Sequence, residues 1–559
     1  MSLLKKLFTS FVLALAFSAP AFAIDYYIVD CQPGADLACI AGDDTRTATQ
    51  AQNPETPWRT WAGVPAINKQ GNTRFLFGRG GYLTNVKIGL GWLTGTKSRT
   101  TELTPVAFDA YTPSWCVGSC TNTKPVLEQS TSNQNLFESN TGGSRLADGG
   151  YIFRNLKLVG GGSTSYPAVT KGQVGIFLYD VVRGVIIENM DISGFASAIQ
   201  PANNNNLYTY NLVVRNSYIH HNTGASVLGG ANGLLIENNL FEYNGDPDAI
   251  PDSHDMYLSY VNNGVVRNNI FRNTTFTQTS KCGKTVFVVH GKVDGLLIEG
   301  NRFEQPGGIG TCYGIEVDNG YLTAEHMKNV VIRDNLVVDV GGVGIVVGVC
   351  QNCVIESNSI VWTSVSSQCF IGISTYGGNA PKPIDTPNQQ ISIRNNSVYM
   401  NCNGNGTIQG MTIKNAGNQH SVTNNITYFG PNTSTRTSRT CINWDTNTPA
   451  NFLATGKNIC YYSGGTPTWS NLHSTLGAAQ AAGWDAGSLN VDPLFVATPA
   501  AGNDYSLAVQ AGSPAVNAGH ATYKSRLSAG RKFPIDQRDI GAHDFGAVLI
   551  APVAPISFR

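Results

Sequence analysis

The stretch LLIENNLF at 234–241 is followed by GVVRNNIF at 264–271 and LLIEGNRF at 296–303, and all three follow one pattern. Apolar residues alternate, a charged residue follows, and then come an Asn and another apolar residue. The pattern continues along the chain in VVIRDNLV (330–337), CVIESNSI (353–360), ISIRNNSV (391–398) and HSVTNNIT (420–427). The sequence is therefore an internal repeat, and a repeat decides the fold before any other feature does.

The shared Asn gives the length of the repeat. It falls at Asn239, Asn269, Asn301, Asn335, Asn358, Asn396 and Asn425, with gaps of 30, 32, 34, 23, 38 and 29 residues. Alternation with period two marks strands, and a coil of short strands and turns fits gaps of about 20 to 40 residues. An Asn stacked on an Asn passes hydrogen bonds along the axis and tolerates left-handed backbone geometry. We therefore expect stacked coils with an Asn ladder, with loops extruded where the gaps are long.

A second kind of strand precedes each ladder strand. Its copies are GIFLYD (175–180), DMYLSY (255–260), VFVVHGK (286–292), GIEVDN (314–319), GIVVGV (344–349), GISTYG (372–377) and GMTIKN (410–415). Earlier ladder strands are YIFRNLKL (151–158), GVIIENMDI (184–192) and LVVRNSYI (212–219). Strict succession of two strand types over about ten repeats predicts an all-β solenoid of parallel sheets with a continuous apolar interior.

With these repeats, the chain resembles the secreted pectin-lyase-like superfamily of right-handed parallel β-helix proteins. The start, with DYYIV (25–29) and TPWRTW (56–61), is similar to the first segment of many bacterial members. NVDPLF (490–495), GSPAVNAG (512–519) and RDIGAHD (538–544) are similar to the usual last segment. The resemblance implies a capping part at 24–150, central coils at 151–430, and C-terminal coils, loops and tail at 431–559. It implies fold better than chemistry, because the superfamily holds lyases, hydrolases, epimerases and adhesins.

Residues 1–23 have the form of a secretory signal peptide. Lys5 and Lys6 precede an apolar run at 11–17, and Ala21-Phe22-Ala23 has the form of a cleavage site. We therefore expect an exported protein, periplasmic or secreted, and no later segment approaches the roughly 20 apolar residues of a membrane span. A formal net charge of +0 with 13% charged residues argues against nucleic acid as a partner. We expect a monomer that binds a polysaccharide.

The twelve Cys of an exported chain predict disulfides. Two spacings match one repeat, and they join Cys282 to Cys312 and Cys369 to Cys402. Local loops are expected to be closed by Cys31 with Cys39, Cys116 with Cys120, and Cys441 with Cys460. Cys350 and Cys353 have the spacing of half a zinc site, but a matching second half is not evident.

The outward positions of the second strands concentrate functional groups in adjacent coils. Because alternate strand residues face outward, one face is predicted to carry His254, Tyr257, His290, Lys292, Glu316 and Asp318. The chain has only nine His, so two of them on one face are informative. Each side chain also has the simpler interpretation of a solvated outward residue. His220 and His221 follow a ladder strand, and we expect them in a turn.

The resemblance implies chemistry that such a face can supply. Cleavage of a uronate polymer by β-elimination needs a base for the C5 proton, positive charge for the carbanion and an acid for the leaving oxygen. Lys292 or His290 is the candidate base, and Tyr257 or His254 the candidate acid. Glu316 and Asp318 are candidate ligands for Ca²⁺. Ser259, Tyr376 and Lys414 are candidate substrate-binding groups. No other cofactor is expected.

Four functions compete on this basis. A polysaccharide lyase acting on an acidic glycan ranks first. A uronan C5-epimerase ranks as an alternative, since Asp252-Ser-His-Asp255 is loosely similar to the Asp-Pro-His motif of mannuronan epimerases, although Ser253 replaces the Pro. An inverting glycoside hydrolase would use two carboxylates, for which Glu316 and Asp318 are candidates. A non-catalytic glycan-binding or adhesive β-helix predicts no such cluster.

Overall fold

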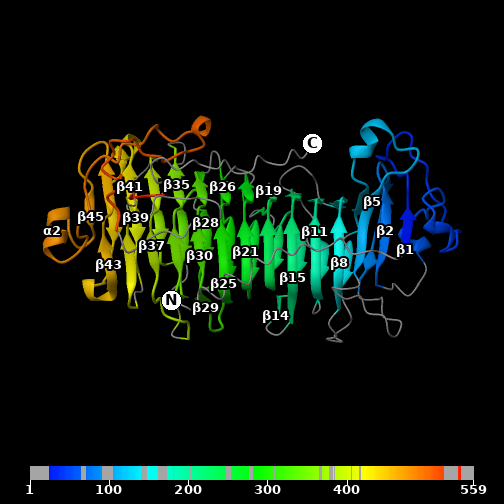
Figure 1. Cartoon of the computed structure of the whole chain (residues 1–559), viewed down its shortest axis with the longest axis horizontal. Coiled ribbons are helices and arrows are strands. Elements are labelled where there is room, and N and C mark those ends of the chain that lie inside the picture. The colour runs from blue at the N-terminus through cyan, green and yellow to red at the C-terminus, as the bar shows by residue number, and fades with distance from the viewer. Residues whose placement is uncertain are drawn as a thin grey trace.

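The chain winds into a long parallel β-helix (Figure 1). The computed structural model describes residues 24–64, 71–90, 105–131, 133–139, 148–161, 173–179, 182–201, 203–204, 207–246, 254–275, 281–305, 309–310, 312–363, 368–376, 382, 384–403, 406–414, 417–520 and 539–542. The signal-peptide prediction for residues 1–23 lies outside this part, as do Asp252 and Ser253. Figure 1 shows the strands side by side along the long axis, with β1 near one end and β45 near the other.

Three sheets form the walls, and a typical coil contributes one strand to each. Sheet C comes first in the coil and contains β4 (Ile88–Gly89), β7 (Phe137–Ser139), β10 (Val174–Leu178), β13 (Ser197–Pro201), β17 (Val227–Gly229), β20 (Met256–Ser259), β24 (Phe287–His290), β28 (Tyr313–Val317), β32 (Val343–Val347), β36 (Ile371–Ser374), β39 (Thr407–Thr412), β42 (Ser438–Asn443) and β45 (Thr468–Ser470).

Sheet A follows and contains β1 (Ile24–Ile28), β2 (Thr73–Gly78), β5 (Val106–Tyr111), β8 (Asp148–Arg154), β11 (Val182–Glu188), β14 (Asn203–Asn204), β15 (Leu207–Arg215), β18 (Ala231–Glu237), β21 (Asn262–Arg267), β25 (Lys292–Glu299), β29 (His326–Lys328), β30 (Val331–Arg333), β33 (Cys350–Gln351), β34 (Val354–Glu356), β37 (Ser392–Arg394), β40 (His420–Thr423) and β43 (Phe452–Gly456). Its pairings are parallel except for the short β14–β15 contact.

Sheet B lies beyond the Asn turn and contains β3 (Tyr82–Leu83), β6 (Val126–Gln129), β9 (Lys157–Gly160), β12 (Asp191–Ser193), β16 (Tyr218–His220), β19 (Leu240–Glu242), β22 (Ile270–Arg272), β26 (Arg302–Glu304), β31 (Leu336–Val338), β35 (Ser359–Trp362), β38 (Ser397–Met400), β41 (Ile426–Phe429) and β44 (Ile459–Tyr462). Strands β23 (Lys281–Cys282) and β27 (Ile309–Gly310) pair separately. The predicted all-β parallel solenoid is confirmed.

Helical structure in the described part is short. It consists of α2 (Leu476–Ala481) and the 3₁₀ turns η1 (Gln50–Gln52), η2 (Trp61–Gly63), η4 (Gly118–Asn122), η5 (Pro431–Thr435), η6 (Pro449–Asn451) and η7 (Ala501–Asn503). None of the helices found there is long and apolar enough to cross a membrane.

The interior is apolar and stacked. Phe271 lies with its ring centroid 4.7 Å from that of Phe241 and 4.7 Å from that of Phe303, in near-parallel stacks. The three residues come from consecutive coils and are fully buried. The period-two apolar pattern produces this core because one face of every strand points inward.

The Asn ladder runs where the sequence predicts it. Asn301 is typical: its side-chain N donates to Asn335 Oδ1 at 3.0 Å and to the carbonyl of Val266 at 2.9 Å. The backbone N of Asn269 donates to Asn301 Oδ1 at 3.0 Å. The ladder extends to Asn458, whose side chain bonds Asn425, and towards the other end Ser217 takes the Asn place.

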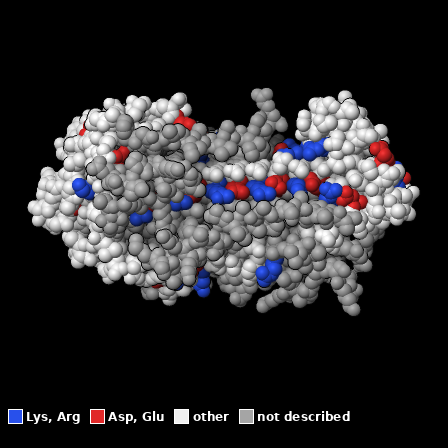
Figure 2. Space-filling view, viewed as in Figure 1, with Lys and Arg blue, Asp and Glu red and all other residues white. Residues whose placement is uncertain are grey.

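A second ladder, of charges, runs up the outer face of sheet A. One position per coil is alternately acidic and basic, in the order Asp109, Arg154, Glu188, Arg215, Glu237, Arg267, Glu299, Arg333, Glu356 and Arg394. Ion pairs form within it, as between Arg267 and Glu237 at 2.7 Å. Figure 2 shows the row of alternating charges along the axis. The sequence pattern predicts a charged residue there, but the alternation of sign emerges only when the coils are aligned.

Disulfides close several coils and loops. The predicted pairs Cys31–Cys39, Cys116–Cys120, Cys369–Cys402 and Cys441–Cys460 are present. Cys350 pairs with Cys353, so these two thiols are not half of a zinc site. Cys312 is also disulfide-bonded, and the side chain of Cys282 lies outside the described residues. Disulfides of this number are typical of proteins that fold in an oxidising, extracytoplasmic compartment.

Candidate functional site

The outer face of sheet C brings most of the predicted site residues together in two columns. Glu316 pairs with Val288 in the preceding coil, which in turn pairs with Tyr257. The neighbouring column holds Ser259 beside His290. These residues face away from the core because Phe287, Val289 and their equivalents in adjacent coils fill the interior. Their catalytic roles stay predictions.

Lys292 is not on this face, and the sequence-based placement of it there is wrong. Strand β24 ends at His290, and the chain turns at Gly291, whose φ of +89° belongs to the left-handed region. Lys292 then begins β25 in sheet A, where it pairs with His326 and is exposed. The corner therefore separates Lys292 from the cluster on sheet C.

Glu316 and Asp318 form a carboxyl pair on one strand face. Asp318 is fully buried, and within the described part of the chain neither of its carboxylate oxygens has a hydrogen-bond partner. Burial, and then the charges of Glu316 and Glu325, raise the pKa of Asp318 well above its usual value. Glu316 is 7% exposed and accepts a hydrogen bond from the Thr285 hydroxyl. Burial and the neighbouring acidic groups therefore favour the protonated form of Asp318.

His290 is held firmly beside this pair. Its Nδ1 lies 2.8 Å from the carbonyl oxygen of Asp318, so Nδ1 carries the proton. Burial lowers the pKa of His290, which keeps the ring neutral. Gly320 covers Nε2, and a Cβ there would lie only 2.6 Å from that atom. With one nitrogen bonded and the other covered, His290 packs and orients its neighbours rather than offering a free base.

The loop after β28 contributes residues that sequence reasoning missed. The Glu325 carboxylate accepts from the backbone N of Gly291 at 2.6 Å, of Gly320 at 2.8 Å and of Tyr321 at 2.7 Å. Tyr257 donates its hydroxyl hydrogen to the Tyr321 hydroxyl at 2.9 Å. No sequence signal could have found this clamp, because its partners are backbone amides and one of them lies in the preceding coil.

Tyrosines surround the acid pair. Tyr313 is half-buried, and burial followed by the charges of Glu316 and Asp318 raises its pKa. Burial and the hydrogen bond with Tyr321 likewise raise the pKa of Tyr257. Beside His290 and Thr285, the pair thus has phenol groups nearby, which can stack on sugar rings and bond their hydroxyls.

The remaining predicted residues lie at the edges of this cluster. The Nδ1 of His254 lies 2.9 Å from the carbonyl of Thr285, and its ring lies 5.6 Å from that of Tyr257. Lys414 places its Nζ 5.0 Å from the ring centroid of Tyr376. Tyr376 and Lys414 lie in adjacent coils, further along the helix from Asp318. Ser259 is fully buried.

Calcium binding at Glu316 and Asp318 stays a prediction. Ca²⁺ takes six to eight oxygen ligands. Among the described residues there is no group of three or more His, Cys, Asp and Glu side chains placed to hold a metal. Glu316 and Asp318 supply two carboxyl groups, so further oxygen ligands would have to complete such a site. We derive no step through a metal.

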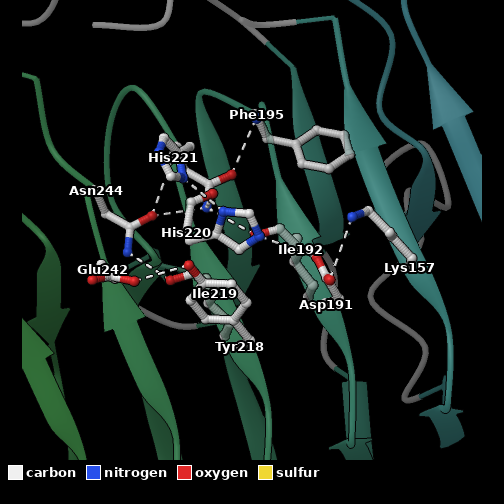
Figure 3. A network of polar contacts seen from close by, with 11 residues as sticks. Lys157, Asp191, Ile192, Phe195, Tyr218, Ile219, His220, His221, Glu242 and Asn244 are labelled. Atoms are coloured by element: carbon white, nitrogen blue, oxygen red, sulfur yellow. Dashed lines mark hydrogen bonds and ion pairs between the residues drawn. The ribbon is translucent and has the colours of Figure 1, made fainter. Parts of the chain in front are cut away.

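A second polar network lies on the outer face of sheet B (Figure 3). His220 ends β16, and His221 follows in the expected turn with a φ of +51°. The Nε2 of His220 lies 3.1 Å from Asp191, and its Nδ1 lies 2.7 Å from Nδ1 of His221. Tyr218 stacks on His220 and bonds Glu242 at 2.9 Å. The groups satisfy one another, so the network stabilises adjacent coils.

Comparisons with known proteins agree with the fold. Residues 146–325 match the family model described as the right handed beta helix region. No curated protein matches the chain. A lacto-N-biosidase of family GH136 from Eubacterium ramulus is 11% identical, with 78% of this chain and 67% of that chain covered and a TM-score of 0.40. Pectate lyase Pel9A is 13% identical over 94% and 98%, with a TM-score of 0.35. The Streptococcus pneumoniae surface protein and adhesin PfbA is 13% identical over 73% and 98%, with a TM-score of 0.37.

These findings define the class of protein. The chain has the right-handed parallel β-helix, or pectin-lyase-like, fold. Proteins with this fold include hydrolases, lyases and an adhesin. At these identities the likeness concerns the fold alone, and activity has to be argued from the site.

Proposed function

We propose that the protein binds a glycan along the outer face of sheet C and hydrolyses it at the Glu316–Asp318 pair. The observation that carries the proposal is the fully buried Asp318 carboxyl, whose pKa is raised beside a second carboxylate. Glycoside hydrolysis needs one protonated and one ionised carboxyl flanking the scissile bond. Burial of Asp318 beside acidic neighbours favours its protonated state, as the acid of such a pair requires.

The charges favour hydrolysis over the elimination that ranks first on sequence. Elimination from a uronate requires positive charge to stabilise the carbanion. Among the described residues, the acidic groups Glu316 and Glu325 raise the pKa of Asp318, and His290 Nδ1 lies 3.6 Å from its Oδ1. Lys292 lies in another sheet, and Lys414 lies over the ring of Tyr376, further along the helix from Asp318. A negatively charged sugar at Asp318 would be repelled, whereas a neutral sugar would not.

The two carboxyls have distinct roles in this proposal. Asp318 gives its proton to the glycosidic oxygen as the bond from that oxygen to the anomeric carbon breaks. Glu316 takes a proton from the water whose oxygen bonds to that carbon. Proton exchange with solvent then restores both groups. An inverting mechanism would require the two carboxyl groups to lie roughly 6.5–9.5 Å apart, which leaves room for the attacking water. Because Asp318 is buried, substrate binding must also expose its carboxyl.

The test is a panel of soluble neutral and acidic polysaccharides assayed for two products. New reducing ends without ultraviolet absorbance from a 4,5-unsaturated uronate support hydrolysis. Asp318→Asn and Glu316→Gln are each expected to reduce turnover by about 10³-fold or more, consistent with the loss of general acid or base catalysis. Glu237→Gln, a carboxylate on sheet A, is the matched control. An unsaturated product would establish elimination instead. Retention of full activity in Asp318→Asn would show that Asp318 is not the general acid.

A further inference from the structure

Two tyrosines stand with nearly parallel rings where sheet C turns into sheet A. The centroids of Tyr260 and Tyr321 are 6.1 Å apart, with 11° between their planes. They come from coils that are separated by one further coil, whose corner residue is Gly291. A Cβ on Gly291 would lie 3.4 Å from Tyr321 and 3.5 Å from Tyr260. A side chain at this corner would thus meet both rings at van der Waals distance, and glycine keeps it out of their way.

The fold holds both rings in place before any ligand arrives. Glu325, which is 1% exposed, fixes the backbone of Tyr321 by accepting from its N and from that of Gly320. Asp385 in turn accepts from the backbone N of Glu325 at 3.1 Å. The side chain of Tyr321 is fixed at its hydroxyl by Tyr257.

Tyr260 is constrained through its backbone. Its φ is +55°, a conformation that is uncommon for a bulky residue and costs on the order of 1–2 kcal/mol. The surrounding coils must therefore hold it there. Both tyrosines are nevertheless half-buried rather than buried, so part of each ring reaches the surface. Leu322, next to Tyr321, is 88% exposed and extends the apolar surface.

We propose that Tyr260 and Tyr321 form a sugar-binding subsite, on which the apolar face of a neutral pyranose ring packs beside the acid pair. The inference rests on the proposed function and adds a binding position to the same face. Aromatic rings offer a large contact area, and rings that are already fixed lose little conformational entropy on binding. The Tyr257 hydroxyl bond joins this subsite to the column that contains Glu316. Glu325 is its positioning residue.

The experiment separates the rings from their supports. Each variant is made in the Asp318→Asn background, so that polymer is bound but not cleaved. Retardation in gels containing a β-glucan, a galactomannan, an arabinoxylan or a homogalacturonan measures the dissociation constant. Tyr321→Ala and Tyr260→Ala are expected to weaken retardation about tenfold, whereas Tyr321→Phe retains the ring and most of the binding. Tyr461→Ala is the matched control, since Tyr461 is a half-buried tyrosine of sheet B whose ring centroid lies 5.4 Å from that of Tyr428.

A second measurement tests Glu325 as a positioning residue. In otherwise wild-type protein, Glu325→Ala is expected to raise KM with a smaller effect on kcat, and Glu325→Gln to restore part of the loss. Near-wild-type retardation by both tyrosine-to-alanine variants, with far-ultraviolet circular dichroism unchanged, would overturn the subsite even if hydrolysis is observed. Retardation that depends on both rings, without any hydrolysis, would instead keep the subsite and refute the proposed function. A protein that retards none of the four polymers would overturn both.

Discussion

Glu356 is the residue of the charge ladder whose removal should cost most. It pairs in register with Arg333 on one side and Arg394 on the other. Arg394 donates from Nε at 2.8 Å and approaches with Nη2 at 2.8 Å. The side chain of Glu356 is 2% exposed and that of Arg394 is 15% exposed. Glu356→Gln keeps the shape of the side chain and removes its charge.

The size of the effect follows from this burial. Removing one partner of a buried pair costs about 3–5 kcal/mol, because the other charge stays desolvated. Arg333 keeps its ion pair with Glu299, and the arginines retain some contact with water. We therefore expect a loss of about 2–3 kcal/mol. Glu237→Gln is the matched control, since its partner Arg267 is 43% exposed and the loss should stay below about 1 kcal/mol.

Urea unfolding followed by circular dichroism measures the difference. The midpoint should fall further for Glu356→Gln than for Glu237→Gln, with the same slope for both. Adding Arg394→Gln to Glu356→Gln should recover part of the loss, because the uncompensated charge is removed as well. Equal losses in the two single variants, or no recovery in the double variant, would refute the reasoning that burial controls the strength of the ladder.

Three further outcomes are expected. Asn301→Ala removes a side chain that is 1% exposed and bonds both neighbouring coils, and it should lower the free energy of unfolding by about 3 kcal/mol in urea melts; a loss under about 1 kcal/mol would contradict a structural role for the Asn ladder. Burial lowers the pKa of His420 to about 4, so its contribution to stability is complete above its unfolded value of about 6.5 and declines by roughly 3 kcal/mol as the pH falls to about 4. A His420→Gln variant should lose this part of the acid sensitivity in melts at pH 7 and pH 4, and an unchanged pH dependence would rule the histidine out. Treatment with EDTA should leave hydrolysis unchanged, because the proposed acid and base are carboxyl groups that act without a metal ion; loss of activity that returns with Ca²⁺ would show that a metal is required.

The fold was readable from sequence because each coil repeats the same local physics. The alternation of apolar residues predicts the strands, and the repeated Asn predicts the turn. Ser217 also occupies the ladder position that the aligned segments predict for it. The site was less accessible. The alternation in VFVVHGK continues through Gly291, yet the backbone turns there, and Lys292 moves to another sheet. A glycine within a strand pattern is the signal that was available.

Other parts of the site have no sequence signature. Glu325 accepts hydrogen bonds from backbone amides. Amides are present at almost every residue, so the sequence around Glu325 gives no sign that it holds this loop in place. The raised pKa of Asp318 depends on burial, together with a carboxylate from the neighbouring loop. Such properties arise only when separate coils are stacked.

The charge ladder on sheet A also disfavours misfolded states in which a coil stacks on the wrong neighbour. The Asn ladder is made of identical members, so a chain that skipped one coil while folding would still find Asn beside Asn. The charge ladder would not permit this, since leaving out any one coil between Arg154 and Arg394 brings its two neighbours together and sets Arg beside Arg or Glu beside Glu there. Like charges placed opposite each other are destabilising. Omission of one coil, or of any odd number of coils, therefore places like charges in contact wherever it occurs on the ladder. Omission of an even number does not, so differences in loop length and core shape must disfavour that arrangement.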